Sequence, residues 1–302
     1  MDGVLAVWKP EGWTSHDVVA KVRRILKMKR IGHTGTLDPM VTGVLPLCLG
    51  RATRMVEYIQ ERSKTYEAIL RLGVATDTED MTGNVLEEKQ VSGLTEVKVR
   101  EVLQQFLGEV EQIPPMYSAV KVDGKRLYEL ARMGQTVERK ARVVHIHDIS
   151  LLKTDLDKMH PEIAFTVTCS KGTYIRTLCV DIGKALNVPA VMVKLVRTMS
   201  GGLQQSDSLT IEQIEAFSNG GELNKYIIAP DQAVSHLPEL TLPPQLAERA
   251  TRGMKITARE IVIPEHLQDG DIIRVYDQER RFVGLFQNDQ VNERISPAKI
   301  FS

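Results

Sequence analysis

Residues 32–50 of the chain read GHTGTLDPMVTGVLPLCLG, a glycine-rich loop that runs into an apolar segment. Glycine permits tight turns of the backbone and the close approach of a ligand. Pro39 restricts Asp38 to extended conformations, so the carboxylate of Asp38 is held rather than mobile. The apolar residues after Gly43 are typical of a buried strand. The pattern predicts a loop that mounts one carboxylate, a candidate nucleophile, on a rigid scaffold.

The segments on either side of this loop predict strands. Residues 4–8 are apolar and end at Lys9-Pro10. Apolar and polar residues alternate over 66–72 and over 163–169, which is the period of a half-buried strand. Together with the apolar run after Gly43, these segments are expected to form a sheet.

Two segments predict helices. Thr14 or Ser15 can cap a helix whose apolar residues recur at helical spacing as far as Leu26. A second helix is expected to start near Tyr174 and to end before Pro189. Strands and helices do not alternate in a regular βαβ order. The sequence therefore predicts an α+β fold with a mixed or antiparallel sheet and flanking helices.

The composition is that of an ordinary globular protein. The chain has 302 residues, 42% hydrophobic and 26% charged, which is enough for a catalytic domain and a smaller second domain. Its three cysteines have no paired spacing, the N-terminus has no signal-peptide pattern, and no apolar run approaches transmembrane length. A cytoplasmic protein without disulfides is expected.

The formal net charge of zero conceals an uneven distribution of charge. Residues 1–56 carry nine Lys and Arg against four Asp and Glu, whereas residues 57–116 carry six against twelve. Residues 117–142 are basic again, with seven against three. A neutral protein with one basic face can bind nucleic acid. The basic residues within 21–30 form either an ordinary solvated helix face or a surface that contacts phosphate.

Residues 117–142 have the composition of an exposed excursion. Gly124 and Gly134 interrupt any regular element there. The segment is either an ordinary soluble loop and helix or a mobile basic arm that becomes ordered on a nucleic acid.

The end of the chain predicts a small β domain. A boundary is expected between Pro230 and Pro238. Short β-like runs follow at 261–263, 271–276 and 282–286, and an Asp-Gly pair breaks them.

Five segments resemble, in order, the conserved blocks of the TruB family of tRNA pseudouridine synthases. The loop at 32–39 resembles the catalytic motif of that family. The other four blocks are WKPEGWTS at 8–15, KTYEA at 64–68, IPPMYSAVK at 113–121 and CSKGTYIRTL at 169–178. Because five blocks share one order over roughly the first 200 residues, the resemblance is specific.

The resemblance implies an isomerase that converts the T-loop uridine at tRNA position 55 to pseudouridine, without a cofactor or a metal. It implies that the target base is flipped out of the tRNA. Asp38 is the implied nucleophile, attacking either ribose carbon 1′ or uracil carbon 6, and Arg176 is its cationic partner. Tyr66 is the implied active-site tyrosine, which can stack on uracil or help to remove a proton.

The resemblance also implies residues that bind the substrate. His33 is expected to stack into the space that the flipped nucleotide leaves. Leu195 is expected to form an apolar wall of the pocket, Lys9 to support the catalytic loop, and Tyr174 to pack near Asp38. The other implied substrate-binding residues are Lys64, Tyr117 and Lys121.

On the same resemblance, residues 1–232 form a pseudouridine synthase catalytic domain, and residues 233–302 form a PUA-like RNA-binding domain. The basic segment at 117–142 is then expected to be an RNA-binding arm of the catalytic domain. The implied partner is the T-stem-loop of tRNA, and a monomer without membrane or metal contacts is expected.

Two other RNA-related functions share features with this one. A protein that only remodels tRNA and helps its elbow to fold would need base flipping but no catalysis, and both roles can coexist in one protein. A guide-RNA-dependent pseudouridine synthase shares much of the catalytic block, but the short C-terminus without basic tails favours the stand-alone type.

The glycines of the loop could also suggest an NTPase. However, the loop lacks the Gly-Lys-Ser/Thr ending of a phosphate-binding P-loop, so this function is set aside. His145 and His147 could form a metal pair, but no third ligand has suitable spacing.

Overall fold

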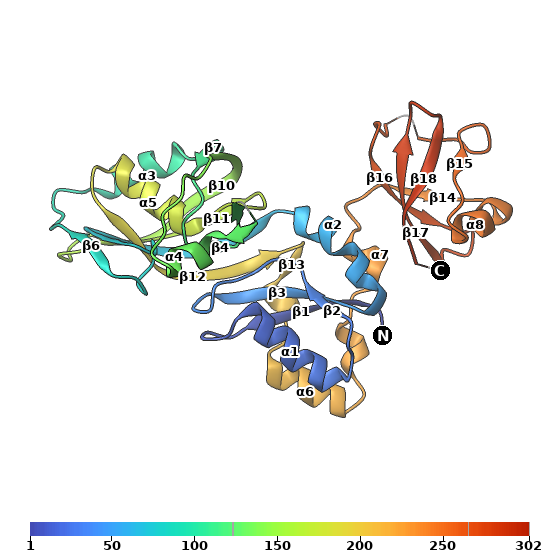
Figure 1. Cartoon of the computed structure of the whole chain (residues 1–302), viewed down its shortest axis with the longest axis horizontal. Coiled ribbons are helices and arrows are strands. Elements are labelled where there is room, and N and C mark those ends of the chain that lie inside the picture. Colours follow the sequence, from blue (N-terminus) through green and yellow to red (C-terminus); the bar gives the residue numbers. More distant parts are fainter. Residues whose placement is uncertain (123, 265, 302) are drawn as a thin grey trace.

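The computed structural model describes residues 1–122, 124–264 and 266–301 (Figure 1). A nine-stranded sheet runs through the larger part of the molecule, and a five-stranded sheet forms from the end of the chain. Figure 1 shows the second sheet standing to one side of the first, beyond the short helices α2 (Val56–Glu61) and α7 (Pro230–Ala233). This mixture of sheets and flanking helices confirms the predicted α+β class.

The large sheet is mixed, as predicted. β12 pairs in parallel with β3, and the other described strand pairs of this sheet are antiparallel. In spatial order the strands are β1 (Gly3–Lys9), β3 (Thr42–Leu49), β12 (Ala190–Ser200), β4 (Lys64–Leu72), β11 (Glu162–Cys169), β10 (Arg142–Asp155) and β7 (Gly108–Gln112), with β2 (Ile31–His33) beside β3 and β13 (Leu203–Gln204) beside β12. The four strands that the sequence predicted are β1, β3, β4 and β11.

Two helices cover the β1–β3 end of the sheet. They are α1 (Ser15–Leu26) and α6 (Ile211–Asn219), whose apolar residues share one core with those of β1 and β3. The Thr14 hydroxyl accepts a hydrogen bond from the backbone N–H of Asp17, and the Asp17 carboxylate accepts one from the backbone N–H of Thr14. This capping box sets the point at which the chain turns into α1.

Two other helices, α3 (Glu96–Gln104) and α5 (Ile175–Ala185), cover the far half of the sheet. α5 is the helix predicted to start near Tyr174, and Tyr174 is its N-cap. Its buried residues pack with Phe165 of β11 and with the inner residues of β4. The start of α5 therefore lies on the same sheet as the loop at 32–39.

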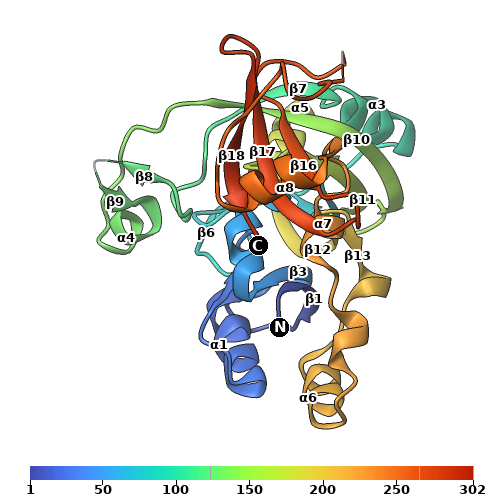
Figure 2. The ribbon, with the colours of Figure 1, turned by 90° about the vertical axis from the view of Figure 1, so that its right-hand side faces the viewer.

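The basic segment forms a small unit of its own, with β8 (Lys121–Val122), β9 (Lys125–Arg126) and α4 (Leu127–Arg132). Figure 2 shows α4, β8 and β9 projecting from the side of the molecule, at the end of two long connections. Leu127 is fully buried within this unit, while Arg126 and Arg132 are exposed. The segment is thus a projecting arm with basic residues on its surface.

The C-terminal sheet is a curled sheet in the order β14 (Glu239–Thr241), β16 (Ile272–Tyr276), β17 (Phe282–Asp289), β18 (Arg294–Ile300) and β15 (Ile256–Thr257), with α8 (Pro244–Thr251) packed on it. The predicted strands at 271–276 and 282–286 are confirmed as β16 and β17. The remaining described elements are η1 (Gly50–Met55), α2 (Val56–Glu61), β5 (Val74–Thr76), β6 (Val85–Glu88), η2 (Gln205–Asp207), η3 (Leu223–Tyr226) and α7 (Pro230–Ala233).

The predicted strand at 261–263 is wrong. The segment is irregular, with Val262 89% exposed and Pro264 directly after it. Ile261 and Ile263 do pack on the core of the small sheet. Alternating burial therefore mimics a strand here, but Glu260 closes a turn on Thr257 just before the segment and Pro264 has no N–H to extend pairing.

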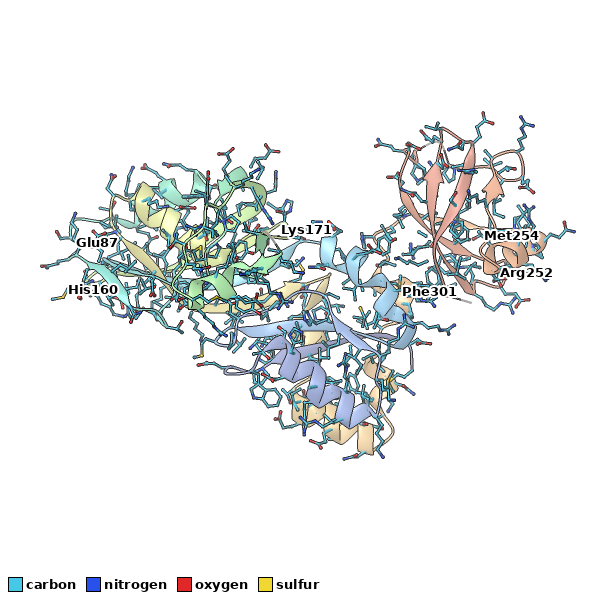
Figure 3. The ribbon with its side chains drawn as sticks, in the orientation of Figure 1. Glu87, His160, Lys171, Arg252, Met254 and Phe301 are labelled. Carbon is cyan, nitrogen blue, oxygen red and sulfur yellow. The ribbon has the colours of Figure 1, made fainter. Side chains whose placement is uncertain are left out.

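The two sheets meet where the end of β18 contacts η1 and α2. Arg51 donates to the carbonyl of Phe301 at 2.6 Å, and Arg54 donates to the carbonyl of Ile300 at 2.6 Å. Phe301, which Figure 3 labels at this junction, is buried in one cluster with Met55 and residues of β1 and β3. Lys299 adds an ion pair to Glu57 at 2.9 Å. Apolar and polar contacts thus join the small sheet to the large one.

Within the described residues, no helix is both long enough and apolar enough to cross a membrane.

Candidate active site

The loop that carries Asp38 connects β2 to β3 and is tied down at both ends. The buried ammonium group of Lys9 donates to the carbonyls of Pro39 (2.9 Å), Trp13 (2.6 Å) and Pro10 (2.9 Å). This is the support that the sequence assigned to Lys9.

A second tether comes from the first residue of α1. The backbone N–H of Leu37 donates to the Ser15 hydroxyl at 2.9 Å, and that hydroxyl donates to the carbonyl of Leu37 at 3.4 Å. Ser15 is fully buried. Because the capping box fixes α1, it also fixes the residue that precedes Asp38.

Asp38 forms an ion pair with Arg176, the first-turn arginine of α5, with Nη2 and Oδ2 3.1 Å apart. The Asp38 side chain is 45% exposed and the Arg176 side chain only 7%. The other hydrogen bonds of Arg176 go to the carbonyls of Thr78 at 3.0 Å and Tyr117 at 2.8 Å. The two-bond grip that a guanidinium can give a carboxylate is not the arrangement here, since a single contact joins the pair. Arg176 instead links three segments, the catalytic loop, the 77–84 loop and the start of the arm.

Tyr66 and Leu195 lie beside this pair. Both are 8% exposed and belong to one apolar cluster with Leu37 and Val41 of the catalytic loop. Burial raises the pKa of the Tyr66 phenol above its ordinary value. The structure therefore brings Tyr66, Leu195, Asp38 and Arg176 to one place at the centre of the sheet.

Arg197 is a residue of this site that the sequence reasoning missed. It is 1% exposed, and in β12 it is two residues after Leu195, on the same face of the strand. Gly43 is paired with it across the parallel strands, and a Cβ on Gly43 would lie 2.2 Å from the Arg197 carbonyl oxygen. The period of two from Leu195 was the signal that could have found it.

Lys64 does not present its charge to solvent. It is 6% exposed, and its ammonium group donates to the carbonyls of Gln60 at 2.6 Å and Arg62 at 2.7 Å. Burial lowers the pKa of Lys64 to about 8, and burial likewise lowers that of Lys9 to about 8. In this structure both lysines hold backbone segments, and a contact with substrate stays a prediction.

His33 lies at the end of β2, half-buried, where its Nδ1 accepts a hydrogen bond from the backbone N–H of Gly35 at 3.3 Å. Its ring meets that of His16 edge to face, with centroids 5.4 Å apart. Burial, together with His16 and Arg197, holds the pKa of His33 below its ordinary value. His33 is therefore a neutral aromatic side chain at neutral pH.

His33 also lines an open cavity of about 730 Å³ between α1, β2 and η1. The apolar residues that line this cavity include Val19, Ile31 and Val56. Its basic lining residues are His16, Arg23, Lys29 and Arg30. The basic residues within 21–30 were interpreted from the sequence either as a solvated helix face or as a surface that contacts phosphate. Several of them border this cavity next to His33.

The other predicted residues have different placements. Tyr174 is half-buried, and its backbone N–H and carbonyl are both bonded to the side chain of Gln112, which fixes the start of α5. Tyr117 is half-buried and contributes its carbonyl to Arg176. Lys121 is exposed on β8 of the arm.

No metal centre is found within the described part of the chain, where no group of three or more His, Cys, Asp or Glu side chains could hold an ion. The rings of His145 and His147 lie 4.8 Å apart on β10. The two histidines thus form a pair without a third ligand among the described residues.

Comparison with known proteins shows the family of the chain. Residues 23–175 match the family described as "TruB family pseudouridylate synthase (N terminal domain)", and residues 176–235 match the "tRNA pseudouridylate synthase B C-terminal domain". The chain is 45% identical to "tRNA pseudouridine synthase B" of Bacillus subtilis, over 99% of this chain and 97% of that protein. It is also 45% identical to the protein of the same name from Bacillus licheniformis, with the same coverage.

Solved structures show the same fold over nearly the whole chain. The chain resembles a structure titled "Crystal Structure of a Cbf5-Nop10-Gar1 Complex" with a TM-score of 0.78 and 28% identity, covering 99% of this chain and 85% of the other. A structure titled "Structure of H/ACA RNP bound to a substrate RNA containing 2'-deoxyuridine" matches with a TM-score of 0.76 and 26% identity, covering 99% and 85%. With the matched domains and full-length relatives, the chain belongs to the TruB family of tRNA pseudouridine synthases, which are isomerases.

Proposed function

We propose that this chain converts the T-loop uridine at position 55 of tRNA to pseudouridine, with Asp38 as the nucleophile. The observation that carries this proposal is the single contact between the half-exposed carboxylate of Asp38 and the buried guanidinium of Arg176. The buried guanidinium of Arg176 orients the carboxylate and still leaves part of it accessible, which is what a nucleophile requires.

The reaction needs no redox partner and no activated phosphate. The bond between uracil nitrogen 1 and ribose carbon 1′ breaks, the base turns and carbon 5 joins carbon 1′. Carbon 5 then loses its proton, and nitrogen 1 gains one from solvent, so the product is an isomer of uridine. Asp38 would add to ribose carbon 1′ or to uracil carbon 6. The apolar residues around it, Leu195 among them, would hold the detached uracil away from water.

We propose further that His33 fills the space left by the flipped uridine. A neutral, half-buried ring at the end of β2 can stack on a base without carrying a charge into the RNA helix. The cavity next to it, with apolar and basic lining residues, suits the nucleotides that flank the flipped one. The exposed basic residues of the arm would close over the same strand.

The decisive experiment is tritium release from unmodified tRNA labelled at uracil carbon 5, with wild type and Asp38→Asn compared. Asp38→Asn keeps the shape of the side chain but removes the nucleophile, so release is expected to fall by at least about 10⁴-fold while tRNA affinity changes less than about threefold. Substantial turnover by Asp38→Asn would sink the assignment of the nucleophile. Glu67→Gln, an exposed carboxylate on β4, is the matched control and should behave like wild type.

We also propose that the protein helps tRNA to fold, as a monomer acting in the cytoplasm. The basic cavity beside His33 and the arm are separate from the Asp38–Arg176 pair, so RNA can be gripped and released without chemistry. In that view residues 1–232 are the catalytic domain and residues 233–302 a PUA-like RNA-binding domain. Asp38→Asn should then retain the folding activity, measured as the rate at which misfolded tRNA regains its aminoacylation.

A further inference from the structure

A buried guanidinium lies behind the proposed active site, and the reaction described above gives it no role. Arg197 is the bulkiest of the fully buried side chains, at 1% exposure. Its Nε donates to the carbonyl of Val44 at 2.8 Å, and its Nη2 donates to the carbonyl of Gly35 at 3.3 Å. Tyr66 is its direct neighbour across the antiparallel pair of β12 and β4, on the same face of the sheet. One side chain thus ties β3 to the catalytic loop and lies beside Tyr66.

Among the described residues Arg197 has no counter-ion: its side-chain hydrogen bonds go to two neutral carbonyls, and its cross-strand neighbour is a phenol. Lys9, Lys64 and Arg176, also buried, add three more cations to the same region, and within the described part of the chain Asp38 is the one acid paired with any of their side chains. Burying charge without a partner costs several kcal/mol per ion, so this surplus of positive charge is expensive to maintain. Such a site is built for negative charge that develops elsewhere in it.

The group that can take up this negative charge is the phenol of Tyr66. The charged and titratable groups that face it are Arg197 from β12, Asp38 from the catalytic loop and Cys169 from β11. Burial raises the pKa of Tyr66, and of these three neighbours only Arg197 acts in the opposite direction. A tyrosine can accept a proton only as its phenolate, and without Arg197 this phenolate would be an uncompensated anion in the core.

We propose that Arg197 is a positioning residue for pseudouridine formation: it holds the phenol oxygen of Tyr66 at the uracil and stabilises the ionised form of that oxygen, which makes Tyr66 the base. The inference rests on the proposed function. After carbon 5 has joined carbon 1′, the Tyr66 phenolate takes the proton from carbon 5. The electron pair of that C–H bond restores the double bond between carbons 5 and 6, and the phenol later gives its proton to water.

A double-mutant cycle tests whether Arg197 acts through Tyr66. Arg197→Lys keeps the charge but loses the guanidinium that bridges the carbonyls of Val44 and Gly35 beside Tyr66. Single-turnover tritium release should fall about 10- to 100-fold for Arg197→Lys in the wild-type background, and by less than about threefold in a Tyr66→Phe background. Arg62→Lys is the matched control, because Arg62 is a partly buried arginine that, like Arg197, donates to a backbone carbonyl, that of Gly201 at 2.7 Å.

The pH profile of the same single-turnover rate gives a second readout that a merely structural role would not move. If Tyr66 phenolate is the base, the rate rises with pH, and Arg197→Lys should shift that rising limb to higher pH by about one unit. The proposal would be overturned if Arg197→Lys reduced the rate of tritium release equally in both Tyr66 backgrounds, or if it left the rising limb of the pH profile in place. If Tyr66→Phe releases no measurable tritium, the position of that limb alone decides. Asp38→Asn separates the two proposals. If Asp38 is not the nucleophile, Asp38→Asn keeps its tritium release; if only the role of Arg197 is wrong, Asp38→Asn still loses release while the double-mutant cycle shows no coupling.

Discussion

At the scale of single residues, neighbours from other elements hold Asp38, Arg176 and His33 in place. Arg176 forms an ion pair with Asp38 and donates hydrogen bonds to the carbonyls of Thr78 and Tyr117. His33 is neutral because burial and the nearby cation Arg197 both disfavour its protonated form. Each side chain is thus prepared by neighbours that come from different elements of the fold.

Substitution of His33 tests its proposed stacking role. His33→Ala loses a stacking partner worth about 1–3 kcal/mol per base, so kcat/KM on tRNA should fall about 5- to 150-fold. His33→Phe keeps an aromatic face and should stay within about tenfold of wild type. If kcat/KM, measured by tritium release, fell equally in the two variants, stacking would not explain the contribution of His33.

The same residue predicts a pH dependence of stability. The pKa of folded His33 lies below the ordinary value of about 6.5, so the unfolded chain binds this proton more tightly. Stability is therefore complete above about pH 6.5 and decreases as the pH falls towards the folded pKa. In thermal melts from pH 7.5 down to pH 5, the melting temperature of His33→Phe should fall less than that of the wild type. His236 also has a lowered pKa, but it is present in both proteins, so the difference between them reports on His33.

At the scale of elements, the arm is a small unit that projects from the rest of the molecule. Its helix α4 is short, and Arg126 and Arg132 approach the ring of Tyr128 from within the same unit, at 5.8 and 5.6 Å from its centroid. These contacts hold basic side chains together on an exposed surface. Only Tyr117, through its carbonyl, connects the base of this segment directly to Arg176.

Removal of the basic residues of the arm should change how tRNA binding depends on salt. Each lost phosphate contact reduces the slope of log affinity against log salt by about 0.7–0.9, so Lys125→Ala, Arg126→Ala and Arg132→Ala together should reduce it by about two to three. The control removes three exposed lysines outside the arm, Lys98, Lys153 and Lys184, and should leave the slope unchanged. A slope that is the same in both triple variants would mean that the arm does not contact RNA phosphates.

At the scale of the whole molecule, the junction between the two sheets determines how a single RNA could contact both. It combines buried Phe301 with the hydrogen bonds of Arg51 and Arg54 to the last carbonyls of the described chain. The small sheet is therefore held at a defined place relative to the catalytic loop, rather than attached only by a linker.

Weakening of this junction should separate the two sheets in function. Arg51→Ala with Arg54→Ala removes two hydrogen bonds worth about 1–3 kcal/mol together, so kcat/KM on full-length tRNA should fall about 3- to 30-fold. Activity on an isolated T-stem-loop, which is too small to reach both sheets, should stay within about twofold. Lys158→Ala with Lys225→Ala, which breaks exposed ion pairs away from the junction, is the control. Equal losses on both RNAs would show that the junction serves stability alone.

The sequence by itself determined the local structure and the identity of the family. Capping at Thr14, the apolar stripe of α1, and the strict alternation in β4 and β11 are encoded within a few residues, because hydrogen bonds and side-chain periodicity along one element decide them. In the loop at 32–39, Pro39 and the glycines likewise predicted that the carboxylate of Asp38 is held in place. The failed strand at 261–263 marks the limit of this reasoning, since alternating burial there arises from packing under a turn.

Only the tertiary structure decided which distant residues share the site. The parallel pairing of β12 with β3 puts Arg197 against Gly43 and the catalytic loop, and nothing near either residue in the sequence encodes that contact. The same holds for Arg176, whose donors turned out to join three loops, and for Lys9 and Lys64, whose charges are buried against carbonyls. Charge and hydrogen-bond partners depend on which chain segments meet in space, and that is set by the packing of the whole sheet rather than by any one element.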